Sequence, residues 1–245
     1  MRRRNVLAML AAGFAAGCNR IADSARGSRA IKAAEAWHQS AQRLLNPPRA
    51  LAPEYARADI SPFFRGNGST NPTNGDYQAH AAAGFRDWRL RVGGLVEQPL
   101  EFSLAQLRAL PQRTQITRHD CVEGWSAIGE WTGPRLALLL DAVGVLPAAR
   151  FVVFHCADEL NGSRYYESID LADARHPQTI VAHSLNGAPL PIRNGAPLRM
   201  RIERQLGYKH AKYLTGVDLV ASLEGIGGGQ GGYWEDRGYQ WYAGI

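Results

Sequence analysis

The feature that most constrains this 245-residue chain is a series of short strand-like runs with no regular strand–helix–strand rhythm between them. Residues 88–93 and 198–203 alternate apolar residues with Arg, Gly or Glu, which is typical of strands that bury one face. Residues 151–154 and 217–223 are apolar enough for buried strands. Short helical patterns and long loops separate these runs. We therefore expect an α+β fold with mixed β-sheets and surrounding short helices.

Helical patterns occur at three places. Residues 31–45 form a weak one. Ser103 can cap a short helix directly after it. A third helix is expected to begin at 132–134, Thr-Gly-Pro, and to end at Gly144, with four apolar residues on one face.

The pentapeptide Asn-Gly-Ala-Pro-Leu occurs twice, at 186–190 and at 194–198. Asn-Gly is a strong turn signal because both residues tolerate a positive φ. The short spacing between the copies predicts two successive turns rather than a domain repeat.

The N-terminus predicts export. Residues 2–4 are all Arg, and the apolar run at 8–16 is too short to span a bilayer. The Arg pair followed by Asn-Val-Leu resembles a twin-arginine signal, the route by which bacteria export folded proteins. An ordinary secretory signal is the alternative. Residues 15–18, Ala-Ala-Gly-Cys, resemble a lipoprotein cleavage site, which would place a lipid anchor on Cys18 as the chain's link to a membrane.

We expect four parts in the chain: an export signal at 1–18, an N-terminal tether at 19–60, the main domain at 61–224, and a tail at 225–245. The tail is rich in Gly and aromatic residues and is expected to pack on the domain, either as a surface flap or as a lid on the substrate side. The formal charge is +6, and the three Arg of the export signal leave +3 on the rest. Such a charge predicts neither nucleic acid nor an anionic membrane as a partner.

Several common sites have no support in the sequence. No Gly-x-Gly-x-x-Gly motif follows a strand, so a Rossmann nucleotide site is not indicated. No His or Cys spacing suits zinc, and no Cys-x-x-Cys-His motif for attached haem occurs. A Gly-x-Ser-x-Gly nucleophile motif is also absent from the sequence.

Two cysteines, Cys121 and Cys156, lie in the main domain. In an oxidising compartment they could form one disulfide. Cys121 follows Arg-His-Asp and precedes Val-Glu-Gly at the expected end of a strand, a setting that suits an exposed ligand to a metal. Arg118 would help to keep this thiol deprotonated. From these residues alone both interpretations remain open.

Four blocks of sequence carry a resemblance to a known family. They are Cys-Val-Glu-Gly-Trp at 121–125, Trp-Thr-Gly at 131–133, Asn-Gly-Ala-Pro-Leu-Arg at 194–199 and Gly-Tyr-Lys-His-Ala-Lys at 207–212. In this order they resemble the sulfite oxidase superfamily. They are most similar to the branch that contains the catalytic subunit of the periplasmic protein-methionine-sulfoxide reductase. The resemblance covers most of the main domain.

The resemblance implies a domain built around one molybdenum–molybdopterin cofactor, in its plain rather than its nucleotide form. In this family the cysteine of the first block is the protein's ligand to molybdenum, so Cys121 is the expected metal ligand and catalytic residue. The third block contacts the cofactor, the fourth wraps its phosphate, and a Phe-rich loop, here 63–68, covers the pterin. By position the expected cofactor-binding residues are Arg65, Asn67, Cys121, Asn194, Arg199, His210, Ala211 and Lys212.

Some of these positions have alternative interpretations. Arg199, Lys209, His210 and Lys212 would supply the positive charge that a phosphate requires. Arg199 could instead lie on a solvated strand face, and Lys209 could be structural. Arg65 and Asn67 could simply form a turn. Cys156 stands where the reductase branch has a Thr near the cofactor, or it could be a buried free thiol.

The expected reaction follows from a departure from the family pattern. Sulfite oxidases carry basic residues after the cysteine, whereas Glu123 stands here and would repel sulfite. We expect a periplasmic molybdenum oxidoreductase, a monomer, that carries out two-electron oxygen-atom transfer on S-oxide or N-oxide substrates, either small molecules or oxidised proteins. A membrane haem protein or a cytochrome would exchange the electrons. His119, Asp120 and Glu123 are the candidates for proton transfer.

A non-enzymatic role is the alternative. The chain could be an envelope lipoprotein that reuses this fold for binding, stabilised by a Cys121–Cys156 disulfide. The two hypotheses differ in the state of the cysteines and in molybdenum content.

Overall fold

The computed structural model describes residues 24–47 and 49–245. The chain divides into two units, residues 1–47 and residues 48–245. The export signal predicted at 1–18, with its Cys18, lies outside the described residues. Among the described helices, none is long and apolar enough to cross a membrane.

In the first unit the described element is helix α2 (Ala25–Leu45). Ser24 caps the helix, because its hydroxyl accepts a hydrogen bond from the Gly27 N–H at 3.0 Å. The helix confirms the pattern predicted at 31–45 and begins earlier than expected.

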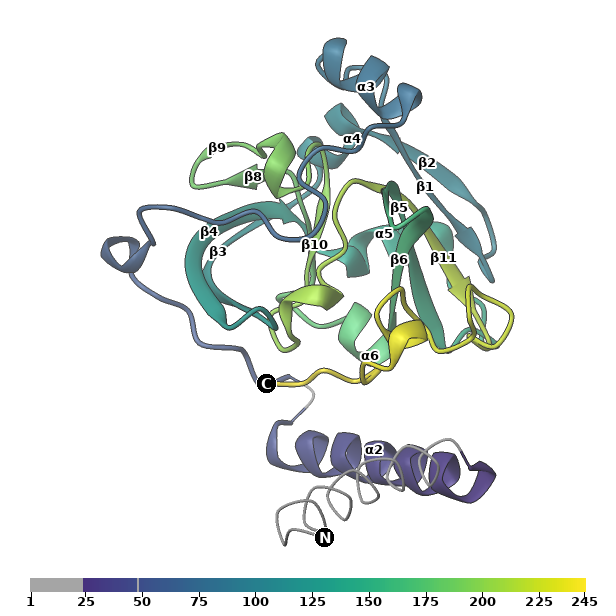
Figure 1. The fold of residues 1–245 in the computed structure, drawn as a ribbon. Helices are drawn as coiled ribbons and strands as arrows, with labels where there is room; N and C mark the ends of the chain where they lie inside the picture. Colours follow the sequence, from purple (N-terminus) through teal and green to yellow (C-terminus); the bar gives the residue numbers. More distant parts are fainter. Residues whose placement is uncertain (1–23, 48) are drawn as a thin grey trace, which may run out of the picture. The chain divides into compact units, whose positions relative to one another are not determined.

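A five-stranded mixed sheet forms one part of the second unit (Figure 1). In spatial order its strands are β2 (Leu100–Ser103), β1 (Arg89–Gly94), β11 (Leu214–Val220), β5 (Phe151–Leu160) and β6 (Ser163–Asp170). β1 and β11 run parallel, whereas the other neighbours run antiparallel. The strands predicted at 88–93, 151–154 and 217–223 are confirmed. The mixed pairing, with short helices around it, confirms the α+β fold.

A second sheet carries a long hairpin. Its strands are β3 (Gln112–Cys121), β4 (Trp125–Pro134), β8 (Ser184–Leu185) and β9 (Ala188–Pro189). β3 and β4 pair along their whole length, and Cys121 opposite Trp125 is the last pair before the turn. A ribbon of β7 (Ile180–Ala182) and β10 (Arg199–Arg201) completes the sheets, and Figure 1 shows β10 between the hairpin and β5. Cys121 therefore lies at the tip of the hairpin.

The predicted start of the third helix is wrong. Residues 132–134 end β4, where Thr132 pairs with β8 and its hydroxyl lies 2.9 Å from that of Thr114. Helix α5 (Leu136–Val143) begins after this strand and ends at Gly144, whose φ is +67°. The local Thr-Gly-Pro signal was overridden by pairing with strands distant in sequence.

Short helices connect the strands. Ser103 caps α4 (Leu104–Ala109), as predicted, and Gln106 completes a capping box. The remaining helices are α3 (Gly75–Ala82) and α6 (Leu171–Ala174), with the 3-10 turns η1 (Arg57–Asp59), η2 (Ile192–Asn194), η3 (Gly207–Lys209) and η4 (Glu235–Arg237).

The two copies of the repeated pentapeptide take different conformations. Asn186 and Gly187 form the turn between β8 and β9, with φ values of 53° and 77°, which confirms a hairpin turn there. In the second copy Asn194 ends η2 and Gly195 has a φ of 109°. A Cβ on Gly195 would lie 2.9 Å from the Cβ of Lys212, so this glycine lets the two segments approach closely.

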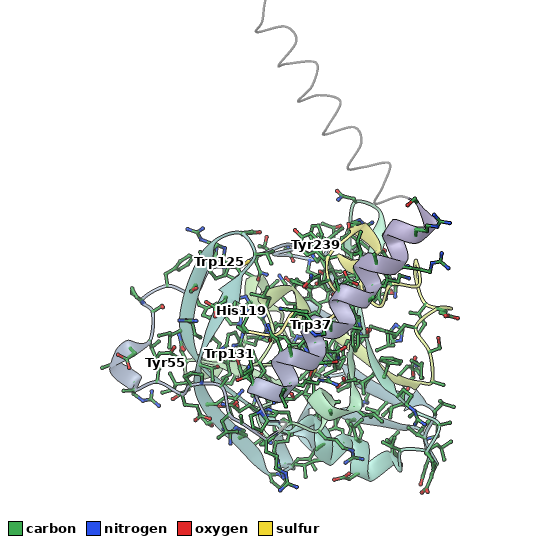
Figure 2. The ribbon with its side chains drawn as sticks, turned by 90° about the horizontal axis from the view of Figure 1, so that it is seen from below. Trp37, Tyr55, His119, Trp125, Trp131 and Tyr239 are labelled. Carbon is green, nitrogen blue, oxygen red and sulfur yellow. The ribbon has the colours of Figure 1, made fainter. Side chains whose placement is uncertain are left out.

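Aromatic side chains pack against the hairpin (Figure 2). The ring of Phe64 lies 5.6 Å from that of His119 and 5.0 Å from that of Trp131, and the ring of Trp125 lies 5.6 Å from that of His119. Figure 2 labels His119, Trp125 and Trp131 on the hairpin. Phe64, Trp131 and apolar residues of β7 and β8 form a small core separate from the larger one of the five-stranded sheet. This packing fixes the Phe-rich loop beside the hairpin tip.

Residues 49–60, within the range expected as a tether, lie along the hairpin. The N–H of Tyr55 donates to the carbonyl of Ile116 at 2.9 Å. The side chain of Gln178 accepts from the N–H of Ala52 at 2.8 Å and donates to its carbonyl at 3.0 Å. This segment therefore belongs structurally to the second unit.

A buried ion triad holds the tail against the domain. The ammonium of Lys209 lies 2.6 Å from Glu167 and also bonds Glu235, and all three side chains are buried. The hydroxyl of Tyr166 donates to Asp236 at 2.6 Å. Because two carboxylates neutralise Lys209, the prediction that it adds positive charge for a phosphate is wrong, and the structural alternative holds.

Candidate functional site

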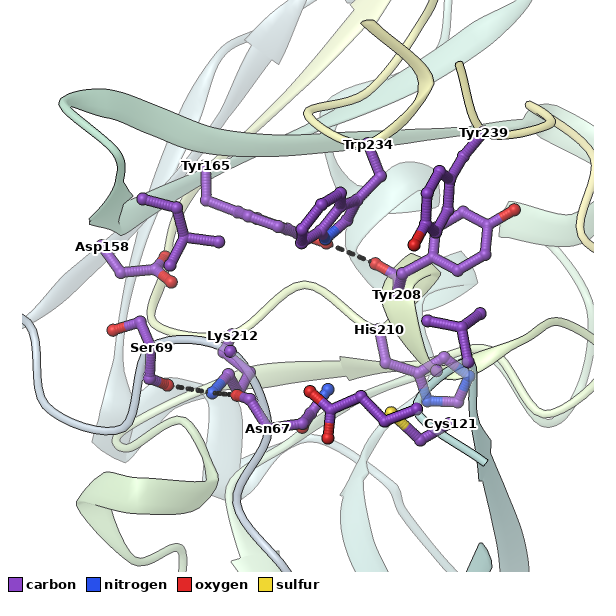
Figure 3. A pocket seen from close by; sticks show the side chains of 15 residues that line it. Asn67, Ser69, Cys121, Asp158, Tyr165, Tyr208, His210, Lys212, Trp234 and Tyr239 are labelled. Carbon is purple, nitrogen blue, oxygen red and sulfur yellow. Dashed lines mark hydrogen bonds between the residues drawn. The ribbon is translucent and has the colours of Figure 1, made fainter. Parts of the chain in front are cut away.

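A pocket of about 650 Å³, its mouth included, opens at the tip of the hairpin. Five separate stretches of chain build it: residues 67–69 of the Phe-rich loop and just after it, the hairpin turn, the β5–β6 strands, residues 207–212 and the tail. Its lining includes Asn67, Ser69, Cys121, Val122, Glu123, Asp158, Tyr165, Tyr208, His210, Lys212, Trp234 and Tyr239. Figure 3 shows aromatic side chains on one side and Cys121, His210 and Lys212 on the other.

Cys121 is 9% exposed, and its thiol is free. Burial raises its pKa, an effect that the charges of Arg65 and Lys212 oppose. Cys156 is also free and fully buried in β5, where burial raises its pKa well above the ordinary value. The predicted alternative of a Cys121–Cys156 disulfide is therefore wrong: the two thiols belong to different sheets.

Two buried arginines of β10 differ in their partners. Arg201 bonds Glu203 through two nitrogens, at 2.9 Å and 2.5 Å. Within residues 24–47 and 49–245, Arg199 donates to the carbonyls of Asn194, at 3.0 Å, and His210, at 3.5 Å, and its Nε has no partner. Arg199 is 1% exposed, so the alternative of a solvated strand face is wrong. Burial and the nearby charge of Arg201 lower the pKa of Arg199 to about 9.

Lys212 is a second buried cation. Its ammonium donates to the carbonyls of Asn67, at 2.5 Å, and Ser69, which fastens the Phe-rich loop to the fourth sequence block. Within the part of the chain that the structure describes, no carboxylate forms an ion pair with it. Burial and the charge of Arg199 lower the pKa of Lys212 to about 7.

Two histidines lie with their rings 5.1 Å apart, His210 in the lining of the pocket and His119 behind it. Arg201 donates to Nδ1 of His119 at 2.9 Å, so the proton of this imidazole lies on Nε2. Nε2 of His210 lies 3.0 Å from the carbonyl of Gln205 and donates to it, which leaves Nδ1 as an acceptor. Burial, followed by the nearby cations, lowers the pKa of both well below the ordinary value, so both are neutral.

The polar atoms around the pocket match an anionic ligand. Among the described residues, Nδ2 of Asn194 and Nε of Arg199 are buried donors without a hydrogen-bond partner. Donors of this kind cost free energy unless an acceptor reaches them. Together with Arg199 and Lys212 they suit an organic group that carries negative charge, and Cys121 adds a soft donor for a metal.

The structure brings most of the predicted site residues together. Asn67, Cys121, His210 and Lys212 line the pocket. Three others, Asn194, Arg199 and Ala211, are buried beside it, and the carbonyl of Ala211 bonds the N–H of Met200 at 2.7 Å. Arg65 is exposed on the same loop as Asn67, with its guanidinium 5.7 Å from the Trp125 ring. Their roles in cofactor binding stay predictions.

Among the proton-transfer candidates only Glu123 lines the pocket. His119 is neutral and already bonded to Arg201, and Asp120 accepts from Arg118 at 3.0 Å and from Ser126 at 2.5 Å. The last two therefore have structural roles.

The sequence did not predict Asp158 or the tail residues Trp234 and Tyr239 as part of the pocket. β5 continues past the predicted strand to Leu160, and burial there takes in Cys156, Ala157 and Asp158 together, so no alternation in the sequence singled out Asp158. Trp234 and Tyr239 come from the tail, where no periodic pattern exists. Their position depends on the buried ion triad.

Comparisons with known proteins agree with this geometry. Residues 77–224 match the family described as oxidoreductase molybdopterin binding domain. Over 230 residues the chain is 40% identical to the provisionally named protein-methionine-sulfoxide reductase subunit YedZ1 of Azospira oryzae, across 93% of this chain and 80% of that one. Over 147 residues it is 35% identical to the protein-methionine-sulfoxide reductase catalytic subunit MsrP of Xanthomonas axonopodis pv. citri, across 56% of this chain and 46% of that one.

A solved structure supports the fold. The sulfane dehydrogenase SoxCD of Paracoccus pantotrophus matches with a TM-score of 0.52 and 23% identity, across 56% of this chain and 39% of that one. This likeness concerns the fold alone. The family match and the 40% identity confirm the resemblance found in the sequence. The chain belongs to the molybdopterin-binding oxidoreductases of the sulfite oxidase superfamily.

Proposed function

We propose that this chain is the catalytic component of an exported molybdenum–molybdopterin reductase of organic S-oxides. The observation that carries the proposal is the pair of buried cations, Arg199 and Lys212, next to the free thiol of Cys121. Family membership supports the cofactor class. The names of the two relatives support S-oxides over the N-oxides that the sequence also allowed.

The residues of the pocket fit such a cofactor. Cys121 would ligate the metal as a thiolate, and the metal would offset the cost that burial adds to its ionisation. Arg199 and Lys212 would neutralise the phosphate, and the free amide nitrogen of Asn194 would donate to it or to the pterin. Asn67, His210, Ala211 and, from the edge of the pocket, Arg65 complete the proposed set.

A bound cofactor of this class supplies a metal that changes its oxidation state by two electrons and accepts an oxygen atom. In the overall reaction an S-oxide, two electrons and two protons give a thioether and water. The S=O bond breaks, sulfur is reduced, and oxygen leaves in the water molecule. The chain's own residues must orient the S-oxide, exclude bulk water and supply protons.

Asp158 is the carboxyl group best placed to hold a proton in the pocket. It is 2% exposed, and its Oδ1 has no hydrogen-bond partner in the part of the chain that the structure describes. Burial raises its pKa to about 6, although Lys212 opposes the shift. The pairing of β5 with β6 shifts register between His155 and Glu159, an interval that includes Asp158. Tyr165 cannot share this role, because its hydroxyl donates to the carbonyl of Tyr208 at 2.6 Å.

We further propose that a separate haem protein, membrane-bound or soluble, supplies the electrons. The twin-arginine pattern supports folded export to the periplasm, since a cofactor inserted in the cytoplasm requires that route. A lipid anchor at Cys18 would then hold the monomer near a membrane partner. Mass spectrometry of the mature N-terminus distinguishes a lipidated Cys18 from a free one.

The test of the function uses protein exported by a bacterial host that makes the cofactor. Wild type is compared with Cys121→Ser, and Cys156→Ser is the control that also removes one thiol. We expect about one molybdenum per chain in wild type and in the control, and reduction of methionine sulfoxide by a reduced viologen dye. Cys121→Ser should lose the activity and change the metal's absorption. Folded wild type without molybdenum would overturn the cofactor, and loaded wild type that reduces no S-oxide would overturn the substrate class.

A further inference from the structure

The aromatic side of the pocket is built largely by the tail. Trp234 and Tyr239 stack with ring centroids 5.2 Å apart at an interplanar angle of 30°. Tyr208 meets Tyr239 edge-on at 5.3 Å. All three line the pocket that contains Cys121, and Figure 3 shows them across the pocket from His210 and Cys121. We call Tyr208, Trp234 and Tyr239 the aromatic wall.

The aromatic wall is held firmly in place. Glu235, next to Trp234, is buried in the ion triad with Lys209 and Glu167. The hydroxyl of Tyr208 donates to the carbonyl of Gln240 at 2.7 Å, beside Tyr239. These bonds fix the rings before any ligand arrives, so a ligand that packs on them orders few side chains.

Two members of the aromatic wall, Trp234 and Tyr239, are separate from the sequence blocks proposed to hold the cofactor, whereas Tyr208 belongs to the fourth block. The family match ends at residue 224, whereas Trp234 and Tyr239 follow it. Arg199 and Lys212, the unpaired cations, do not belong to the wall, and Figure 3 shows Lys212 on the opposite side of the pocket. A contact with the substrate therefore explains the wall better than a contact with the phosphate.

The chemistry of the wall indicates what it binds. Indole and phenol rings offer apolar, polarisable faces that attract methyl and methylene groups and divalent sulfur. They offer little to a small inorganic anion. Tyr239 is 38% exposed at the mouth, so a substrate attached to a longer chain can reach the wall.

We propose that Trp234 and Tyr239 determine substrate specificity by packing against the apolar carbons of a methyl S-oxide side chain, as in a peptide that contains methionine sulfoxide. The inference rests on the proposed function and deepens it. Trp234 forms the inner face of the subsite, and Tyr239 forms its outer edge. Selectivity then favours substrates with methylene carbons next to sulfur over dimethyl sulfoxide.

The test measures binding and turnover separately. A peptide that contains methionine sulfone, which has the same carbons but resists reduction, is titrated into the molybdenum-loaded protein by calorimetry. We expect Trp234→Ala to weaken its Kd roughly tenfold and Tyr239→Ala roughly threefold, in line with the usual worth of aromatic contacts. Trp234→Phe should recover most of the affinity. Trp241→Phe is the matched control, since Trp241 belongs to the tail but does not line the pocket.

Turnover should show the same selectivity. With the peptide sulfoxide, Trp234→Ala should raise KM about tenfold and leave kcat within about twofold, while KM for dimethyl sulfoxide changes much less. Unchanged Kd and KM in both alanine variants would overturn the inference, as would an equal loss for both substrates. If the sulfone binds and the variants weaken it while wild type reduces no S-oxide, the specificity inference stands and the proposed reaction fails.

Discussion

Arg199 and Arg201 lie over the same indole ring, that of Trp131, at 4.9 Å and 4.4 Å from its centroid, yet among the described residues only Arg201 has a carboxylate partner. Two buried guanidinium groups this close repel each other. Glu203 offsets the charge of Arg201. The charge of Arg199 is left for a ligand. The cofactor-free protein therefore loses stability through a residue that its site uses.

Replacing the two arginines should therefore have opposite effects on stability. Arg201→Met leaves Glu203 buried without a cation and should cost about 3–5 kcal/mol. Arg199→Met removes an unpaired buried charge and should leave the free energy of unfolding of the cofactor-free protein unchanged or higher. Urea denaturation of both variants checks this, and equal losses would contradict it. Of these two variants, Arg199→Met is the one that should fold normally and still contain little molybdenum.

The pH dependence of the free energy of unfolding should show how much stability the protein loses by burying the charged ammonium of Lys212. Its pKa is about 7 in the folded protein, below the ordinary 10.5, so the unfolded chain binds more protons between these values. The cofactor-free protein should lose stability as the pH falls from about 10 to about 7, by at most ~1.4 kcal/mol per pH unit. The loss should level off below the folded pKa.

Thermal unfolding of wild type and Lys212→Met between about pH 7.5 and 10 measures this contribution. In wild type, where Lys212 opposes the effect of burial, the pKa of Asp158 is about 6 and lies below that window. The variant should be the more stable protein at the lower end, and the two curves should converge at the upper end. Lys32→Met, at an exposed position of α2, controls for the general effect of removing a lysine. Parallel curves for wild type and Lys212→Met would contradict the prediction.

The ion triad predicts a strong effect of Lys209. Lys209→Met leaves Glu167 and Glu235 buried side by side, which should cost about 3–5 kcal/mol. The midpoint of urea denaturation measures the loss. Adding Glu167→Gln and Glu235→Gln to the same protein should recover much of it. Arg86→Met, in an exposed pair with Asp87, should leave the midpoint unchanged.

Gly207 should not tolerate a side chain. A Cβ at this position would lie 2.5 Å from Nε2 of His119 and 3.1 Å from the carbonyl of Asp120. The neighbours are packed ring and backbone, so Gly207→Ala should cost roughly 1–3 kcal/mol. Gly225→Ala is the matched control, since nothing lies within 4 Å of its added Cβ. Urea denaturation measures both, and equal midpoints would show that η3 can shift.

Much of the fold could be predicted where one face of a strand is apolar. Alternation located β1 and β10, and Ser103 located α4. β4 was not predicted, because Trp125–Pro134 mixes Gly, Glu and Thr. Pairing with β3 and β8 stabilises this strand, whereas its own strand propensity is low. For the same reason the Thr-Gly-Pro signal was misread as a helix start.

The candidate site was likewise predicted in one part and not in another. Cys121, Asn194, Arg199 and Lys212 were predicted from ordered sequence blocks, and the fold gathers them around one pocket. The alternation of 198–203 could not show that its charged face is buried, because burial depends on the hairpin that covers it. Trp234 and Tyr239 lie at the pocket because Glu235, in the same tail, bonds Lys209. These two residues come together only in the folded chain.

The buried ion triad also sets an order of assembly. Residues 225–245 are synthesised after the segments that carry Cys121 and Lys212, so before they fold the pocket lacks Trp234 and Tyr239. Until Glu235 arrives, Lys209 has one fewer carboxylate and the tail has no fixed position. Formation of the triad therefore does two things at once: it fixes the tail on the domain, and it places Trp234 and Tyr239 at the pocket that contains Cys121.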